Sequence, residues 1–376
     1  MLIAHISDTH IRNLKYHYEY KQAFADLYNK LRDQKPDIIV HTGDIAHTKT
    51  QLSPEYFELT SEFLASMADI APLYVILGNH DGNLKNIERQ DALTPIVEAL
   101  DHDNIHLLKD SGETFLEDDI VLNVLSVFDR ENWVKPTDNS KINIALYHGS
   151  ISGCETGQGF TISHGDDTAT IFEDFDFAML GDIHKRQQMD TEGRVWYAGS
   201  TIQQNFGESL RKGYLLWDIR SKDDWDMEFH AVRNPRPFIT VRLDRDGELP
   251  ETHVPRGSYL RVVSGYNLPL TKLRQAVTTA EARWRPYSIT YVNKGVGGAS
   301  RNQGMLADGR FENLRDIDVQ EEMIEEYLIN KELDDGVLEK VLEHNRHYNR
   351  IAESQEEVSR NVIWAVKEMQ WDNLFN

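Results

Sequence analysis

The chain has 376 residues, 40% hydrophobic and 27% charged, which is ordinary for a soluble globular protein of two or three domains. No stretch approaches the roughly 20 uninterrupted apolar residues of a membrane span, and Cys154, the single cysteine, excludes an intrachain disulfide. The net charge of −22 argues against a nucleic-acid protein that relies on its own basic surface, although bound metals or a partner subunit could supply positive charge.

The chain begins with a short apolar run. Residues 1–5 lack the basic segment of a signal peptide and lead into a polar motif, so they are predicted to begin a strand. Together with the single cysteine, this favours a reducing, cytoplasmic location, or the host cytoplasm if the chain is viral.

The first 200 residues alternate between short apolar runs and polar segments with helical spacing. Apolar runs rich in β-branched residues fit buried strands. The predicted strands are residues 3–6, 38–40, 73–77, 142–146 and 177–180. The predicted helices are residues 20–32, 54–67 and 91–100. This alternation predicts an α/β fold.

From about residue 113 the pattern becomes typical of antiparallel β structure. Residues 120–127, 194–198, 214–218 and 225–232 are predicted as hairpin strands, and a second sheet is expected to pack on the first. Two prolines within residues 234–237 indicate a domain boundary, so residues 1–234 are predicted to form the first domain.

Three further regions are predicted beyond this boundary. Residues 235–294 are predicted to form a compact α+β domain, with strands at 239–243, 259–263 and 288–292 and a helix at 270–284. Residues 295–310 begin with a glycine-rich run and are predicted as a flexible linker. Residues 311–376 carry 17 acidic and 7 basic side chains, and apolar residues recur there at helical spacing, which predicts acidic amphipathic helices.

Polar motifs follow five of the predicted strands. They are Asp8-Thr9-His10, Gly43-Asp44, Gly78-Asn79-His80-Asp81, His148-Gly149 and Gly181-Asp182-Ile183-His184. Each motif alone is common in loops. Open α/β sheets, however, bind ligands at the carboxyl ends of their strands, so five motifs in this order indicate one functional pocket.

These motifs predict a centre for two divalent metal ions. The candidate ligands are Asp8, His10, Asp44, Asn79, His148 and His184. Asp44 could bridge two cations with its two oxygens, and mixed oxygen and nitrogen ligands favour manganese, iron or zinc over calcium. Two such ions about 3.5–4 Å apart can clamp a phosphodiester for in-line attack.

His80 is predicted to act on the substrate itself. It follows Asn79 and precedes Asp81, which could fix the His80 tautomer and hold the ring protonated. We expect His80 to stabilise the transition state or to protonate the leaving oxygen. His47, three residues after Asp44, is a second candidate for contacting the phosphate.

At these residues the chain resembles the calcineurin-like metallophosphoesterases, whose pattern is D-x-H, G-D, G-N-H-D, H and G-H-x-H. The resemblance implies a core of two packed β-sheets flanked by helices. It implies one metal held by Asp8, His10, Asp44 and His184. It implies a second metal held by Asp44, Asn79, His148 and residue 182, where this chain has Asp182 instead of the usual histidine. A carboxylate is still a competent ligand, with altered metal preference.

Finer features resemble the SbcD-type DNA repair nucleases. Residues 43–47 match the G-D-x-x-H of that branch, residues 181–187 resemble its G-H-I-H-K-R-Q, and residues 198–213 resemble its A-G-S-x-x-Q-x-x-F-G-E…K-G segment. The compact size and Asp182 are similar to the recombination endonuclease subunits of tailed phages. The resemblance covers nearly the whole chain.

This resemblance implies a DNA exonuclease or endonuclease of recombination and double-strand-break repair that uses Mn²⁺, with Mg²⁺ also possible. Lys185 and Arg186 would contact the substrate. Residues 54–67 and 91–100 would form a homodimer interface, and residues 311–376 would dock on the coiled coil of an SbcC-type ABC ATPase. That ATPase could also provide the basic surface for DNA. No membrane partner is expected.

Two other functions stay open. One is a metal-dependent phosphatase or small-molecule phosphodiesterase, which never meets DNA. The other is a weakly catalytic scaffold for the ATPase, in which Asp182 has cost the chain its second metal. Residues 311–376 could also pack on one another as a C-terminal subdomain. Residues 150–167 form a long loop that could contact substrate, and Cys154 within it has no identifiable activating partner.

Overall fold

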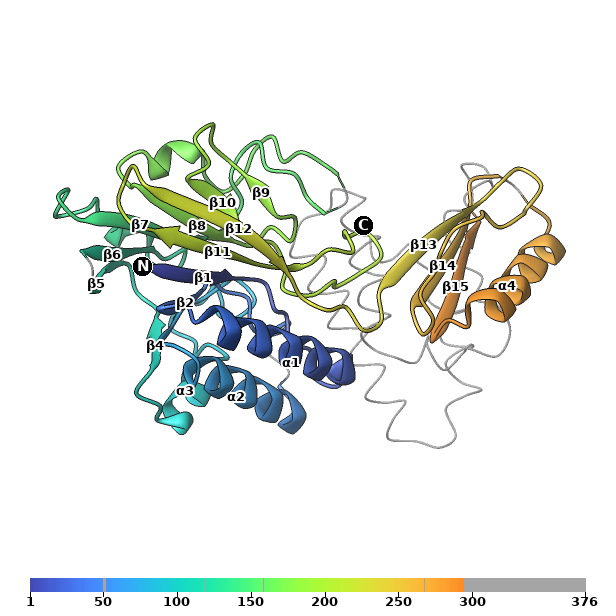
Figure 1. Cartoon of the computed structure of the whole chain (residues 1–376), viewed down its shortest axis with the longest axis horizontal. Helices are drawn as coiled ribbons and strands as arrows, with labels where there is room; N and C mark the ends of the chain where they lie inside the picture. The colour runs from blue at the N-terminus through green and yellow to red at the C-terminus, as the bar shows by residue number, and fades with distance from the viewer. Residues whose placement is uncertain (50–51, 118, 158, 267, 294–376) are drawn as a thin grey trace, which may run out of the picture. The chain divides into compact units, whose positions relative to one another are not determined.

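The computed structural model describes residues 1–49, 52–117, 119–157, 159–266 and 268–293. Its larger part contains two six-stranded sheets (Figure 1). The first has the order β12-β11-β1-β2-β3-β4. Its strands are β1 (Leu2–Ile6), β2 (Ile38–His41), β3 (Leu73–Ile76), β4 (Ile105–Leu108), β11 (Gly213–Ile219) and β12 (Trp225–Ala231). β1 to β4 pair in parallel, whereas β11 is antiparallel to both β1 and β12.

The second sheet has the order β5-β6-β7-β8-β10-β9. Its strands are β5 (Gly112–Phe115), β6 (Ile120–Leu125), β7 (Ile142–His148), β8 (Phe177–Gly181), β9 (Gln187–Gln188) and β10 (Val195–Tyr197). β6, β7, β8 and β10 run parallel, and β5 and β9 are antiparallel edge strands. The fold is therefore α/β with two mixed sheets, as predicted.

Three apolar layers hold these elements together. Side chains such as Ile3, Val40 and Leu146 fill the space between the two sheets. The helices α1 (His17–Gln34), α2 (Pro54–Ala68) and α3 (Thr94–Leu100) cover the other face of the first sheet (Figure 1). The outer face of the second is covered by loop residues, among them Trp133 directly after the short 3₁₀ turn Arg130–Asn132, and by a second 3₁₀ turn, Ala169–Phe172. Burial on both faces explains why the parallel strands are continuous apolar runs.

The prediction that residues 120–127 and 194–198 are hairpin strands is confirmed on one side of each strand, because they pair antiparallel with the edge strands β5 and β9. They form β6 and β10, which are parallel to their central neighbours. Every residue of β6 is buried, so its sequence lacks the alternation of a strand with one wet face. The hairpin of β11 and β12 exists, but it extends the first sheet beside β1.

The predicted helix at residues 91–100 begins later, at Thr94. Asp91 lies ahead of it, and its Oδ1 accepts hydrogen bonds from the backbone N–H groups of Leu93 and Thr94 at 2.9 and 2.7 Å. An aspartate that satisfies free N–H groups in this way favours the start of a helix over its interior. Pro95 then occupies the first turn, where its missing N–H costs no hydrogen bond.

A smaller three-stranded sheet follows in the order β13-β14-β15. Its elements are β13 (Phe238–Leu243), β14 (Tyr259–Ser264), α4 (Leu270–Trp284) and β15 (Ser288–Asn293), as the apolar pattern predicts. The predicted linker at 295–310 and the helices at 311–376 lie outside the described residues. Among the described helices, none has the length and apolar character needed to cross a bilayer.

Candidate metal centre

Four of the predicted ligands occupy the left-handed backbone region. Asp8, His10, Asp44 and Asp182 have φ angles of 51°, 47°, 58° and 91°. The region is unfavourable for residues with a Cβ and persists where the surrounding structure imposes it, often at functional sites. Here each residue stands within a few positions of the end of β1, β2 or β8, where the chain must turn sharply.

Hydrogen bonds join the loops that carry these residues. The N–H of Asp8 donates to the Gly43 carbonyl at 3.1 Å, and the N–H of His10 donates to the Asp44 carbonyl at 3.0 Å. Two glycines allow the close approach of the remaining strands. A Cβ at Gly78 would lie 2.1 Å from Asp44 Oδ1, and one at Gly181 would lie 2.1 Å from the Thr42 carbonyl oxygen.

The first predicted ligand group comes together as a compact cluster. The Nε2 atoms of His10 and His184 lie 2.8 Å apart. His10 Nε2 lies 3.8 Å from Asp8 Oδ1 and 3.5 Å from Asp44 Oδ2. Two imidazole nitrogens bound about 2.1 Å from one ion at right angles would be separated by about 3 Å, so this spacing fits a shared cation.

The second predicted group lies on the other side of Asp44. His148 Nε2 lies 3.4 Å from Asp44 Oδ1 and 3.8 Å from Asp182 Oδ1. The amide nitrogen of Asn79 donates to Asp182 Oδ1 at 3.1 Å. Because Oδ2 of Asp44 faces the first group and Oδ1 faces the second, this carboxylate has the geometry of a bridging ligand.

The histidine rings are oriented by their other nitrogens. His148 Nδ1 lies 2.7 Å from the Thr42 carbonyl oxygen, which can only accept, so Nδ1 carries the proton and Nε2 presents its lone pair. His184 Nδ1 lies 2.7 Å from Glu208 Oε1 and donates to that carboxylate. A ring N–H held by a carbonyl or a carboxylate is the usual support of a metal-bound histidine.

The donor set fits two divalent cations. His148 Nε2 and Asn79 Oδ1 are buried and have no hydrogen-bond partner. Asp8 and Asp44 are almost fully buried, and ionised carboxylates in such places are paired or bind metals. Burial raises the pKa of Asp8, and it raises the pKa of Asp182 to about 6 although His148 opposes it. Added positive charge would keep both carboxylates ionised.

Glu208 is a functional residue that the candidate set lacked. Its buried carboxylate binds His184 through Oε1 and Lys212 Nζ through Oε2 at 2.9 Å. Burial raises the pKa of Glu208, but His184 and Lys212 more than offset this and lower it to about 2. The F-G-E…K-G segment contained the signal, but sequence alone did not connect it to the side chain of His184.

Comparison with known proteins identifies the family of this chain. The family model described as calcineurin-like phosphoesterase matches residues 1–227. The chain belongs to the calcineurin-like phosphoesterase family. This family uses divalent metals, and Asp8, Asp44 and His184, which belong to clusters that could hold a metal ion, lie within the matched region.

Several viral relatives resemble this phosphoesterase. "Uncharacterized protein R555" of Acanthamoeba polyphaga mimivirus is 32% identical over 99% of this chain, but the chain spans only 28% of that protein. "Putative phosphoesterase 244L" of Invertebrate iridescent virus 6 is 26% identical over 48% of this chain and 63% of its own length. "Putative phosphoesterase 078R" of Invertebrate iridescent virus 3 is 24% identical, covering 70% of this chain and 76% of that protein.

Among solved structures, the Pseudomonas putida nuclease MPE aligns with 37% of this chain and 57% of its own. The sequence identity is 16% and the TM-score 0.24.

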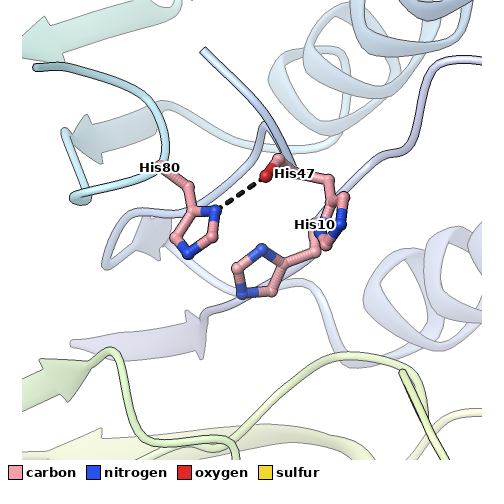
Figure 2. Close-up of side chains that lie close together, drawn as sticks. All are labelled: His10, His47 and His80. Carbon is pink, nitrogen blue, oxygen red and sulfur yellow. Dashed lines mark hydrogen bonds between the residues drawn. The ribbon is translucent and has the colours of Figure 1, made fainter. Parts of the chain in front are cut away.

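Two further histidines, His47 and His80, lie close to the predicted ligand His10. Figure 2 shows His10, His47 and His80, with the His80 Nδ1 atom 2.7 Å from the main-chain oxygen of His47. The ring centroids of His10 and His80 are 4.9 Å apart, and those of His47 and His80 are 5.9 Å apart and nearly parallel. The structure therefore places His80 and His47 beside His10, a residue of the first predicted ligand group.

The predicted pairing of Asp81 with His80 was wrong. Asp81 is fully buried, and its Oδ2 accepts hydrogen bonds from the N–H groups of Asp44 and Gly78 at 2.8 and 3.0 Å. Its Oδ1 accepts from the N–H of Ala46 at 2.8 Å. The carbonyl of His47 fixes the His80 tautomer instead. Asp81 therefore joins the loop after β2 to the loop after β3, because its side chain accepts hydrogen bonds from the backbone of both.

The two predicted substrate cations have protein partners in the structure. Lys185 forms an ion pair with Glu155, and the Arg186 guanidinium carbon lies 3.8 Å from the centroid of the Phe229 ring. Cys154 is buried, and burial raises the pKa of its thiol, with Asp182 adding to the effect. A thiol in this environment is a poor nucleophile, which agrees with the lack of an identifiable activating partner in the sequence.

Replacing Asp81 will destabilise the fold through the backbone donors it satisfies. Asp81→Asn leaves at least one buried N–H facing an amide NH₂ and is expected to lower the free energy of unfolding by about 1–3 kcal/mol. Asp81→Ala leaves three backbone N–H donors without an acceptor and is expected to lower it by about 3–5 kcal/mol. Urea unfolding in the presence of a chelator measures both. Asp110→Asn, at an exposed carboxylate, should stay within about 0.5 kcal/mol of wild type. Equal stability of Asp81→Ala and wild type would show that these hydrogen bonds of Asp81 do not stabilise the fold.

Replacing Glu208 will weaken metal binding. Glu208→Gln removes the charge that supports His184, and we expect Mn²⁺ affinity to fall about 10–100-fold by calorimetric titration. Glu228→Gln, at an exposed position of β12, is the matched control and should bind Mn²⁺ as wild type does. Unchanged affinity in Glu208→Gln would remove Glu208 from the centre.

Proposed function

We propose that this phosphoesterase is a metal-dependent DNA nuclease of the SbcD type, acting in recombination and double-strand-break repair. The supporting observation is that the two segments resembling those nucleases meet at one ligand. Residues 181–187 carry His184, and residues 198–213 supply Glu208 to its ring and Lys212 Nζ to its carbonyl oxygen at 2.7 Å. The nuclease-like features are thus part of the support of the metal centre.

The ligand set supports hydrolysis of a phosphodiester. The first cation would be held by Asp8, His10, Asp44 and His184, and the second by Asp44, Asn79, His148 and Asp182. Two such cations would supply a nucleophilic water and neutralise the charge that develops on the phosphoryl group. Because Asp182 replaces an imidazole, the second set is richer in oxygen, which favours Mn²⁺ or Mg²⁺ over Zn²⁺.

His80 would assist the leaving group. Its Nδ1–H donates to the carbonyl of His47, so the ring presents Nε2 to its surroundings. A protonated His80 can transfer the Nε2 proton to the leaving 3′ oxygen as the P–O bond breaks. His47, whose ring stacks on that of His80, would contact the same phosphate.

The partners follow from the same resemblance. Residues 311–376 would bind the coiled coil of an SbcC-type ABC ATPase, and α2 and α3 would form the interface of a homodimer. Residues 235–294 would cap the nuclease domain and contribute to DNA binding. An ATPase with a basic surface would offset the net charge of −22 that this chain brings to the complex.

His80→Ala should reduce cleavage of linear DNA about 10²–10⁴-fold while the chain still binds metal, because the side chain serves proton transfer and is no ligand in the proposed sets. Cleavage is measured with Mn²⁺, Mg²⁺ or EDTA, beside a generic aryl phosphate, and metal content is measured separately. His102→Ala, at a surface histidine paired with Asp69, should cleave as wild type does. Retained cleavage in His80→Ala would remove His80 from the mechanism.

The wild-type result discriminates between functions. Mn²⁺-dependent DNA cleavage supports the nuclease. Turnover of aryl phosphate without DNA cleavage would instead establish a phosphatase. Absence of both activities, together with one bound ion or none, would indicate the scaffold.

Deleting residues 311–376 should abolish binding of the ATPase and spare Mn²⁺-dependent cleavage, because every proposed ligand lies before residue 185. Binding is measured by co-purification of the two proteins with the full chain as control. A complex that survives the deletion would refute the docking assignment.

A further inference from the structure

Two arginines share one aromatic ring near the metal centre. The Arg186 guanidinium carbon lies 3.8 Å from the centroid of the Phe229 ring, and that of Arg211 lies 5.6 Å from it. Each contact is a cation–π interaction that holds a guanidinium over the ring face. The ring therefore brings two like charges together.

No carboxylate neutralises this pair within the described residues. Arg186 and Arg211 form no ion pair there, whereas the neighbouring Lys185 and Lys212 are paired with Glu155 and Glu208. Burial lowers the pKa of Arg186, and repulsion from Arg211 lowers it further. In a chain with 62 acidic residues, two adjacent arginines that attract no carboxylate are placed to receive an external anion.

The pair lies at the same end of the first sheet as the metal centre. Arg186 is two residues after His184, and Arg211 directly precedes Lys212, whose Nζ contacts both Glu208 and the His184 carbonyl. Phe229 of β12 pairs with Leu215 of β11, which pairs with His5 of β1, three residues before Asp8. An anion held there would be a neighbour of the ligands.

The chemistry of the pair selects phosphate oxygens. Guanidinium groups offer planar forks of N–H donors that match phosphate, and they remain charged at every physiological pH. We propose that Arg186 and Arg211 form an arginine platform that binds the backbone phosphates of DNA beside the bond to be cut. This rests on the proposed nuclease function and names the surface by which that acidic nuclease holds its substrate.

The platform is tested by the salt dependence of DNA binding by the full chain in EDTA, where cleavage does not interfere. Each lost phosphate contact should reduce the slope of log K against log salt by about 0.9 on duplex DNA and about 0.7 on a single strand. The double variant Arg186→Ala/Arg211→Ala should therefore lose about 1.8 from the duplex slope and bind roughly tenfold to a hundredfold more weakly near 0.1 M salt.

Two controls separate charge from packing. Arg186→Lys/Arg211→Lys keeps both charges and should retain most of the wild-type slope. Arg32→Ala removes one charge from α1, where Arg32 lies 5.9 Å from the Tyr28 ring, and should leave the slope unchanged. Thermal unfolding of each variant verifies that it is folded before binding is compared.

The outcomes distinguish the platform from the nuclease itself. Wild-type cleavage of DNA with Mn²⁺, combined with an unchanged slope in the double alanine variant, would overturn the platform and leave the nuclease standing. Wild-type protein that neither binds nor cleaves DNA would overturn both. If inorganic phosphate at millimolar concentration binds the wild type but not the double variant, and DNA does not, the ligand is free phosphate and the DNA assignment is wrong.

Discussion

The buried carboxylate of Asp81 accepts hydrogen bonds from the backbone of Asp44, Ala46 and Gly78 and so ties the loop after β3 to the loop after β2. The geometry around Asp44 and His80 depends on this tie, whereas Thr42 and Glu208 orient His148 and His184. The tie fixes Asp44 in its left-handed turn, with one oxygen toward His10 and the other toward His148. It also sets His80, whose own N–H donates to Asp44 Oδ1 at 2.8 Å. A carboxylate that touches no proposed ligand side chain thus positions two functional residues, Asp44 and His80.

Attraction for an anionic substrate would be confined to the region around the metal centre. The chain is strongly acidic, and the centre itself gathers Asp8, Asp44 and Asp182. Only divalent cations can reverse the sign of the local potential there. The arginines over Phe229 would place positive charge beside this region whether or not the cations are bound, so that DNA binding would depend on the arginines and DNA hydrolysis on the metal sites.

The sequence predicts the local features of this fold well and the long-range ones less so. Strand ends, motif positions and α4 follow from apolar periodicity and from polar residues at the end of each run, which are local signals. The pairing of β11 with β1, or of β6 with β7, joins residues far apart in the chain and leaves no local trace. β4 and β5 were missed because they are short and only partly buried.

The same distinction applies to the centre. The candidate ligands were recognisable from sequence because aspartate, asparagine and histidine side chains carry the oxygen and nitrogen atoms that bind metals. The roles of Asp81 and Glu208 were not, because a carboxylate that holds backbone N–H groups or a histidine looks the same in sequence as one that binds a cation. The proposed partners and the choice of metal depend on molecules that the chain alone does not contain, and they stay predictions.

The centre also has consequences for how the chain folds. Its ligands come from both sheets, and His10 and His184, whose ring nitrogens nearly touch, are 174 residues apart. Closing so long a loop carries an entropic cost that local contacts do not share, and non-local topology slows folding. During synthesis the first four strands can pair early, but the second sheet must emerge before either cation site is complete, and the segment to Lys212 must emerge before His184 of the first site is held in place. Metal binding is therefore expected to occur late in folding and to stabilise two sheets that have already packed together.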